Sequence, residues 1–180
     1  MHKIAFIDRD GVINQDPKEK YYVHNLAEFV WNPGVKEAVR KLKQAGFKVY
    51  VVSNQTGVGK GEVDFQDLNE MTFHMMAEFA ASGAKLDGIH YCTCPPEDNC
   101  DCRKPKTGLF EEALDGIDAD RTQMYMIGDS ERDIEAGNAF GCQSVLVLTG
   151  KSKRDDVQNF RHKPAYVAEN LEGAVHWILN

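Results

Sequence analysis

The stretch IAFIDRDGVIN, residues 4–14, is the part of the sequence that most strongly indicates both the fold and the chemistry. Its first four residues are apolar and are followed at once by polar ones, as in a short parallel strand that is buried on both faces. Asp8 and Asp10 come directly after this run, and Gly11 permits a tight turn beside them. Ligands of doubly wound sheets bind beyond the carboxyl ends of the strands. The stretch therefore predicts a strand that carries two carboxylates to a ligand site.

The same alternation of apolar runs and helical spacing continues along the chain. Further strands are predicted at 49–52, 89–91, 124–127, 144–148 and 166–168. Helices are predicted from Pro33-Gly34 to Gly46 and at 65–81, 107–114, 134–140 and 171–179. We expect an α/β protein, a Rossmann-like three-layer sandwich with a mostly parallel sheet and helices on both faces.

The length of 180 residues suits one domain, so we expect residues 1–180 to form a single unit with no large cap domain. Residues 14–33 separate the first strand from the first helix, and we expect them to fold over the strand ends as a flap. The polar stretch 151–163 is expected as a surface loop or a polar helix.

The composition narrows the possible partners. A net charge of -7 argues against general binding to nucleic acid or to anionic membranes. No apolar run reaches 18 residues, and residues 1–7 lead straight into a strand without a basic and then apolar leader. We therefore expect a cytoplasmic monomer that binds a small molecule, and binds neither nucleic acid nor membrane.

Two carboxylates in the first stretch can divide the hydrolysis of a phosphate ester between them. Asp8 can attack phosphorus and form a covalent intermediate, while Asp10 can protonate the leaving oxygen and then accept a proton from water. Mg²⁺ prefers oxygen ligands and neutralises the repulsion between carboxylate and phosphate. Asp129 and Asp133 follow another predicted strand and supply more acid. An Asp after a strand can also be a turn former or helix cap, but two such clusters favour function.

Two further clusters follow predicted strands or loops. In Ser53-Asn54-Gln55-Thr56-Gly57, a hydroxyl and backbone N–H groups can cradle phosphoryl oxygens, although the same residues also suit a plain turn. Lys104 can offset charge on the transferring group, and Arg103 can contact a second anionic group. The alternative for this basic pair is a solvated surface position.

These stretches together resemble the haloacid dehalogenase (HAD) superfamily of phosphatases over nearly the whole chain. The segment from Asp8 to Asn14 looks like its first motif, and Ser53 like its second. Lys104 looks like the third, and Gly128-Asp129 with Asp133 like the fourth. The stretches 53–57 and 102–105 are similar to the branch that holds heptose 1,7-bisphosphate phosphatases and histidinol-phosphate phosphatases.

The resemblance implies a role for each matching residue. Asp8 would be the nucleophile and Asp10 the general acid and base, with Mg²⁺ held by Asp8, the backbone carbonyl of Asp10, and Asp129. The other implied site residues would contact the phosphoryl group or the rest of the substrate: Ser53, Lys104, Asn54, Gln55, Arg103 and, on the flap, Asp16.

The implied substrate is a small phosphorylated metabolite. The first expectation is removal of the 7-phosphate of D-glycero-D-manno-heptose 1,7-bisphosphate, in the carbohydrate metabolism that leads to lipopolysaccharide. Histidinol-phosphate hydrolysis is the alternative, and a non-catalytic module that binds partners through its cysteine loop is a third. Many heptose enzymes have an arginine where this chain has the segment 58–61, and some have a lysine where it has Ser130.

Four cysteines lie within residues 92–102 as two Cys-x-Cys pairs, Cys92, Cys94, Cys100 and Cys102. Four thiolates on two short arms can close around one tetrahedral zinc ion, and four protein ligands leave no open position for chemistry. Disulfides or free thiols are the alternatives, but disulfides need an oxidising compartment. We expect a structural zinc loop that holds Arg103 and Lys104 in place. In related enzymes a histidine usually stands at the position of Cys94.

Overall fold

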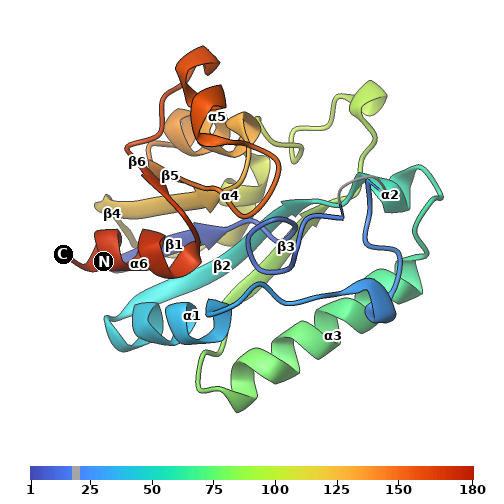
Figure 1. Ribbon diagram of the computed structural model, residues 1–180, viewed down its shortest axis with the longest axis horizontal. Coiled ribbons are helices and arrows are strands. Elements are labelled where there is room, and N and C mark those ends of the chain that lie inside the picture. Colours follow the sequence, from blue (N-terminus) through green and yellow to red (C-terminus); the bar gives the residue numbers. More distant parts are fainter. Residues whose placement is uncertain (18–20) are drawn as a thin grey trace.

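A computed structural model describes residues 1–17 and 21–180, and its centre is one six-stranded sheet (Figure 1). All neighbouring strands are parallel, and their order is β3-β2-β1-β4-β5-β6. The strands are β1 (His2–Ile7), β2 (Phe47–Asn54), β3 (Gly88–Cys92), β4 (Ala119–Gly128), β5 (Gln143–Val147) and β6 (Tyr166–Ala168). This arrangement confirms the predicted parallel sheet.

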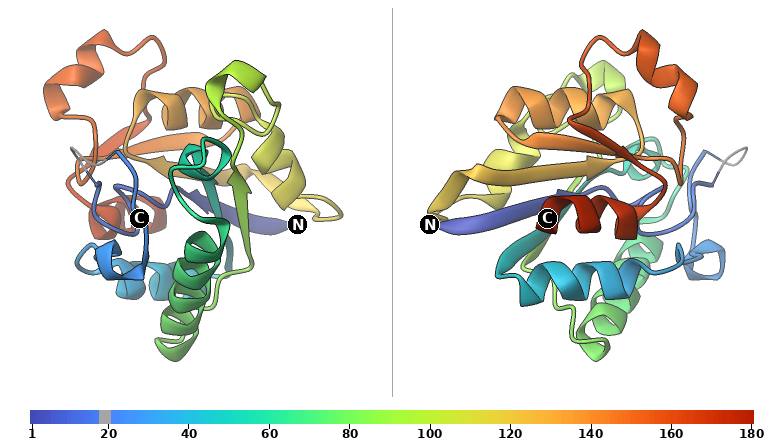
Figure 2. Two further views of the ribbon diagram at one scale, coloured as in Figure 1. Left: turned by 90° about the vertical axis from the view of Figure 1, so that its right-hand side faces the viewer. Right: turned by 60° about the vertical axis from the view of Figure 1, so that its left-hand side comes forward.

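Helices cover both faces of the sheet, as Figures 1 and 2 show. One face carries α1 (Val35–Gln44), α3 (Phe65–Ala81) and α6 (Leu171–Leu179). The other carries α4 (Gly108–Ala113) and α5 (Glu131–Phe140). Shorter elements are η2 (Leu26–Glu28), α2 (Thr56–Gly59), η3 (Pro96–Asp98) and η4 (Arg154–Asn159). The predicted three-layer sandwich is therefore confirmed.

The core forms because successive side chains of a strand point to opposite faces. On β1, Ala5 and Ile7 pack with the helices α1, α3 and α6, whereas Ile4 and Phe6 pack with α4 and α5. All four side chains are fully buried. Fully burying a large apolar side chain contributes roughly 1.5–3 kcal/mol, so β1 anchors both layers.

Two expectations differ from the structure in detail, and a third is narrowed to one of its two alternatives. Strand β4 begins at Ala119 rather than at residue 124, because its first residues are partly exposed and carry no apolar run. Residues 56–59 form the one-turn helix α2 rather than a plain turn. The polar stretch 151–163 contains the 3-10 helix η4.

The strand order reverses at β1, which has β2 on one side and β4 on the other. Ligands of such sheets bind at this switch point. The predicted flap begins here: Asn14 forms backbone bridges with Asp10 and Trp31, and the Asn32 amide donates to the Val12 and Asn14 carbonyls. Residues 18–20 of the flap lie outside the described residues. In the part of the chain that the structure describes, no helix is long and apolar enough to cross a membrane.

Candidate active site

A cavity of about 180 Å³ opens where the loops after β1, β2 and β4 meet. Its lining contains every residue that the sequence predicted for catalysis, substrate binding or magnesium: Asp8, Asp10, Asp16, Ser53, Asn54, Gln55, Arg103, Lys104 and Asp129. These residues come from five separate segments of the chain. The sheet therefore brings the predicted clusters to one place.

Lys104 is the central cation of this cavity and is almost fully buried. Its Nζ lies 3.2 Å from Asp8 Oδ1, donates to Asp133 Oδ1 at 2.6 Å, and donates to the Val52 carbonyl at 2.8 Å. Burial alone would lower the pKa of Lys104, but Asp133 and Asp8 outweigh it and raise that pKa. The ammonium group is therefore kept charged beside Asp8.

Three carboxylates converge on the floor of the cavity. Oxygens of Asp8, Asp129 and Asp133 lie within 4.8 Å of one another. Burial, followed by repulsion from Asp133 and Asp8, raises the pKa of Asp129 well above its usual value. Burial likewise raises the pKa of Asp8, against the attraction of Lys104. Three buried acids exceed the charge of one lysine, so this cluster suits a divalent cation.

Two glycines leave room for this acid cluster. A Cβ on Gly11 would lie 2.2 Å from Asp129 Oδ2, and a Cβ on Gly150 would lie 1.9 Å from it. Asp129 Oδ2 accepts a hydrogen bond from the Lys151 backbone N–H at 2.8 Å. The residues present thus fit Mg²⁺, with Asp8, Asp129 and the Asp10 carbonyl as the ligands that we expect.

Asn54 and Gln55 line the cavity, but their side chains are largely engaged with the protein. The Asn54 amide exchanges two hydrogen bonds with the Lys104 backbone, at 3.0 and 3.1 Å. The Gln55 amide donates to Asp10 Oδ2 at 2.9 Å and to Ser53 Oγ at 3.1 Å. Both residues were expected as substrate contacts, whereas the structure places their amides on other site residues.

The mouth of the cavity carries several cations. Arg103 Nη1 donates to Thr56 Oγ1 at 2.5 Å and to the Cys94 carbonyl at 3.2 Å. Burial, and then the nearby Arg132, lower the pKa of Arg103. Lys60, Arg132 and Lys151 also line the cavity. The sequence analysis did not select these three, because an isolated cation, whether on a loop or in a helix, carries no local signal. Asp133 was noted as extra acid, and its pairing with Lys104 was not foreseen.

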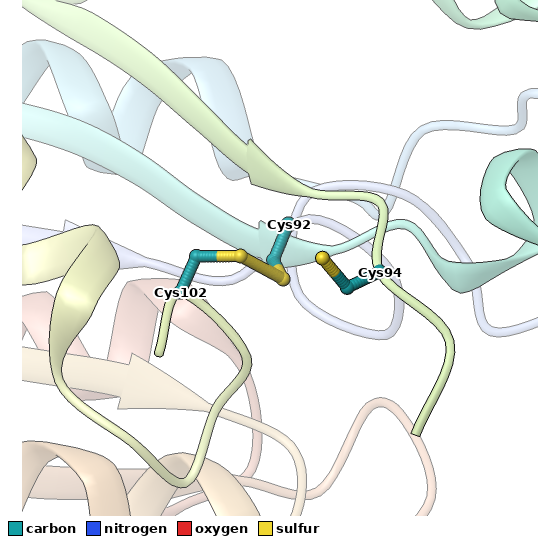
Figure 3. Close-up of side chains that lie close together, drawn as sticks. All are labelled: Cys92, Cys94 and Cys102. Atoms are coloured by element: carbon teal, nitrogen blue, oxygen red, sulfur yellow. A yellow bond between two sulfur atoms is a disulfide. The ribbon is translucent and has the colours of Figure 1, made fainter. Parts of the chain in front are cut away.

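The four cysteines of the 92–102 loop lie together beside the cavity, and Figure 3 shows three of them. The structure joins them as two disulfides, Cys92–Cys102 and Cys94–Cys100, rather than leaving the four free thiolates that were expected. The sulfur atoms of Cys92, Cys94 and Cys102 lie within 4.8 Å of one another. The loop does support Arg103, through the carbonyl of Cys94.

The fold and this site define a HAD-type phosphatase. The HAD-hydrolase-like family model matches residues 101–174. A D-glycero-beta-D-manno-heptose-1,7-bisphosphate 7-phosphatase from Neisseria meningitidis serogroup A is 38% identical, over 91% of this chain and 87% of the relative. One from Escherichia coli O6:H1 is 36% identical, over 97% of this chain and 87% of the relative.

A solved structure agrees with the sequence relatives. The D,D-heptose 1,7-bisphosphate phosphatase from B. bronchiseptica, complexed with magnesium and phosphate, has a TM-score of 0.90 and 32% identity, with 98% of each chain covered. The chain therefore belongs to the haloacid dehalogenase-like hydrolases, and these three relatives, at 32–38% identity, are heptose bisphosphate phosphatases.

Proposed function

We propose that this chain removes the 7-phosphate of D-glycero-D-manno-heptose 1,7-bisphosphate through an aspartyl-phosphate on Asp8. The observation that carries the chemistry is the position of Asp8, with its Oδ1 3.2 Å from Lys104 Nζ and in a cluster with Asp129 and Asp133. The substrate is proposed from relatives that bear this name and are 38% and 36% identical to the chain.

The chemistry has two balanced steps. The Asp8 carboxylate forms a bond to phosphorus while the bond to the sugar oxygen breaks, and that oxygen takes a proton from Asp10. Water then gives a proton to Asp10 and attacks phosphorus, which releases phosphate and restores Asp8. The charged Lys104 and the Ser53 hydroxyl stabilise the transferring group. Mg²⁺, held by Asp8, Asp129 and the Asp10 carbonyl, supplies the positive charge that lets two anions approach.

The charges at the cavity mouth favour a bisphosphate over histidinol phosphate. Arg103, Lys60 and Arg132 line the cavity together, and the proximity of two arginines contributes to the lowered pKa of Arg103. A second phosphate would relieve this repulsion, since arginine binds phosphate by paired hydrogen bonds. Histidinol carries an amine, which the same cations would repel. Asp16 on the flap is proposed as the contact to the sugar.

We also propose that the 92–102 loop holds structural zinc in a reducing compartment. The support is geometric, because the sulfurs of Cys92, Cys94 and Cys102 lie within 4.8 Å of one another and Cys100 lies beside Cys94. Zinc takes four thiolate ligands in tetrahedral sites, and cytosolic conditions keep such thiols reduced. In this proposal the protein is a cytoplasmic monomer with one domain, which acts before lipopolysaccharide assembly.

Turnover of four phosphorylated compounds tests the proposed specificity. Purified protein with Mg²⁺ is assayed for phosphate release from both anomers of the heptose bisphosphate, from histidinol phosphate and from 4-nitrophenyl phosphate. We expect the highest kcat/KM on a heptose bisphosphate. A higher kcat/KM on histidinol phosphate would overturn the substrate, and the absence of turnover on all of them would favour a binding module instead.

A further inference from the structure

Arg9 is a buried cation that the proposed chemistry does not yet use. It stands between Asp8 and Asp10, and only 1% of it is exposed. A buried charge is costly unless it is paired. The guanidinium group pairs with the Asp10 carboxylate: Nε donates to Oδ1 at 3.1 Å, and Nη2 donates to Oδ1 at 2.9 Å and to Oδ2 at 3.1 Å. The interior position of Arg9 is thus explained by Asp10.

Arg9 also contacts an aromatic ring. Its guanidinium carbon lies 5.9 Å from the centre of the Tyr91 ring, and Tyr91 belongs to β3. Tyr91 Oη lies 3.2 Å from Thr72 Oγ1 on α3. Arginine stacks on aromatic rings in a fixed orientation because its guanidinium is planar and delocalised. Arg9 therefore has little freedom to turn away from Asp10.

The contacts of Asp10 differ from those of Asp8. Asp10 also accepts hydrogen bonds from Asn14 Nδ2 at 2.9 Å and from Gln55 Nε2 at 2.9 Å. Asp8 instead faces Lys104 and accepts a bond from the Arg9 backbone N–H at 2.8 Å. One arginine thus contacts both carboxylates, with its backbone on Asp8 and its side chain on Asp10.

We propose that Arg9, braced by Tyr91, is a positioning residue that fixes the Asp10 carboxyl group for proton transfer to the leaving oxygen. This inference rests on the proposed function, in which Asp10 donates that proton as the bond from phosphorus to the leaving oxygen breaks. Without the guanidinium, Asp10 keeps two amide contacts among the residues that the structure describes, from Asn14 and Gln55, and samples other orientations. A misplaced Asp10 should therefore lower the rate most for a substrate whose leaving group needs to be protonated.

The leaving group provides the test. A sugar alcohol is a poor leaving group and needs an acid, whereas 4-nitrophenolate leaves without one. In Arg9→Met, the first-turnover rate of leaving-group release from the sugar phosphate should fall about 100-fold, within the range for general acid catalysis, while the first-turnover release of 4-nitrophenolate falls less than about fivefold. First turnovers are compared because Asp10 also accepts a proton from water in the second step, which both substrates share. KM should change little. Arg9→Lys, which keeps the charge but loses the planar pairing, should be intermediate.

Three control variants make the result specific. Arg121→Met removes another arginine that lies over an aromatic ring, Phe140, away from the cavity, and should leave both activities unchanged. Asp10→Asn should show the same substrate selectivity as Arg9→Met. In the Asp10→Asn background, Arg9→Met should cause no further fall, because residues that act as one unit are not additive.

The outcomes separate this inference from the function on which it rests. Circular dichroism and thermal unfolding first establish that each variant is folded. If Asp10→Asn shows the selective loss and Arg9→Met lowers both activities equally, the positioning role is overturned while the chemistry stands. If Asp10→Asn itself lacks the selective loss, the proposed role of Asp10 fails. An unfolded Arg9→Met leaves Arg9→Lys and Tyr91→Leu, which removes the ring, to decide by the same ratio of activities: a selective loss supports the role, and an equal loss or no loss overturns it.

Discussion

The side chain of Asn54 clamps the backbone of Lys104. Asn54 Nδ2 donates to the Lys104 carbonyl at 3.0 Å, and the Lys104 N–H donates to Asn54 Oδ1 at 3.1 Å. This pair of bonds ties the end of β2 to the loop that follows the cysteines. It also fixes where Lys104 Nζ enters the acid cluster, 3.2 Å from Asp8.

This clamp predicts that Asn54→Ala acts on kcat rather than on KM. Loss of both bonds frees the Lys104 backbone and shifts its ammonium away from Asp8. We expect kcat to fall about tenfold, less than the roughly 100-fold or greater loss expected for Lys104→Met, since removal of one charge-stabilising donor costs about 10²–10³. Steady-state kinetics measure both values. A large rise in KM with unchanged kcat would instead make Asn54 a substrate contact.

The raised pKa of Asp129 predicts a pH-dependent response to Mg²⁺. Because burial and the neighbouring acids raise the folded-state pKa, ionising Asp129 costs stability in the metal-free protein as pH rises above about 3.9 and through that raised pKa. Mg²⁺ binds the ionised form, so the rise in Tm that excess Mg²⁺ causes should be larger at pH 8 than at about pH 5. Differential scanning fluorimetry measures this.

Asp129→Asn provides the matched variant for this prediction. It should abolish most of the Mg²⁺-induced rise in Tm and increase the Tm of the metal-free protein at pH 8, because one buried charge is removed. Asp115→Asn, at an exposed position, should behave like the parent. An Mg²⁺ response that is equal at both pH values, or that survives in Asp129→Asn, would place the ion elsewhere.

The cysteine loop predicts a link between zinc and substrate binding. Protein purified under reducing conditions should contain about one zinc per chain, the stoichiometry of a four-cysteine site. Cys94→Ser should lower the zinc content and raise KM more than it lowers kcat, because the Cys94 carbonyl holds Arg103. Cys142→Ala, a buried cysteine outside the loop, is the control. Absent zinc, together with four unreactive loop cysteines under these conditions, would favour the two disulfides.

The sheet and the position of the acids could be predicted because both leave local signals. Each strand of the site is an apolar run, and Asp8 and Asp129 follow directly where such a run ends. Parallel strands place their carboxyl ends at the same edge of the sheet, so the prediction of parallel strands was enough to predict that the polar clusters lie together. The early start of β4 was missed because the first residues of this strand are partly exposed.

The pairing of side chains within the site could not be predicted in the same way. Two contacts, Asn54–Lys104 and Lys104–Asp133, join segments that are far apart in the sequence. No local sequence pattern indicates which of these side chains contact one another. Arg9 lies between two acids in the sequence and could equally have pointed to solvent. Its pairing with Asp10 and the Tyr91 ring on β3 explain its burial, and neither can be read from local spacing. Such contacts depend on the tertiary fold rather than on spacing along the chain.

The most direct measurement for the proposed chemistry is chemical trapping of the phosphorylated enzyme. Protein turning over heptose bisphosphate with Mg²⁺ is quenched with sodium borohydride, which reduces an aspartyl-phosphate to homoserine, and peptides are analysed by mass spectrometry. We predict homoserine at position 8, dependent on substrate and absent in Asp8→Asn. Active turnover without reduction at Asp8, or with the homoserine at another acid, would contradict a covalent intermediate on Asp8.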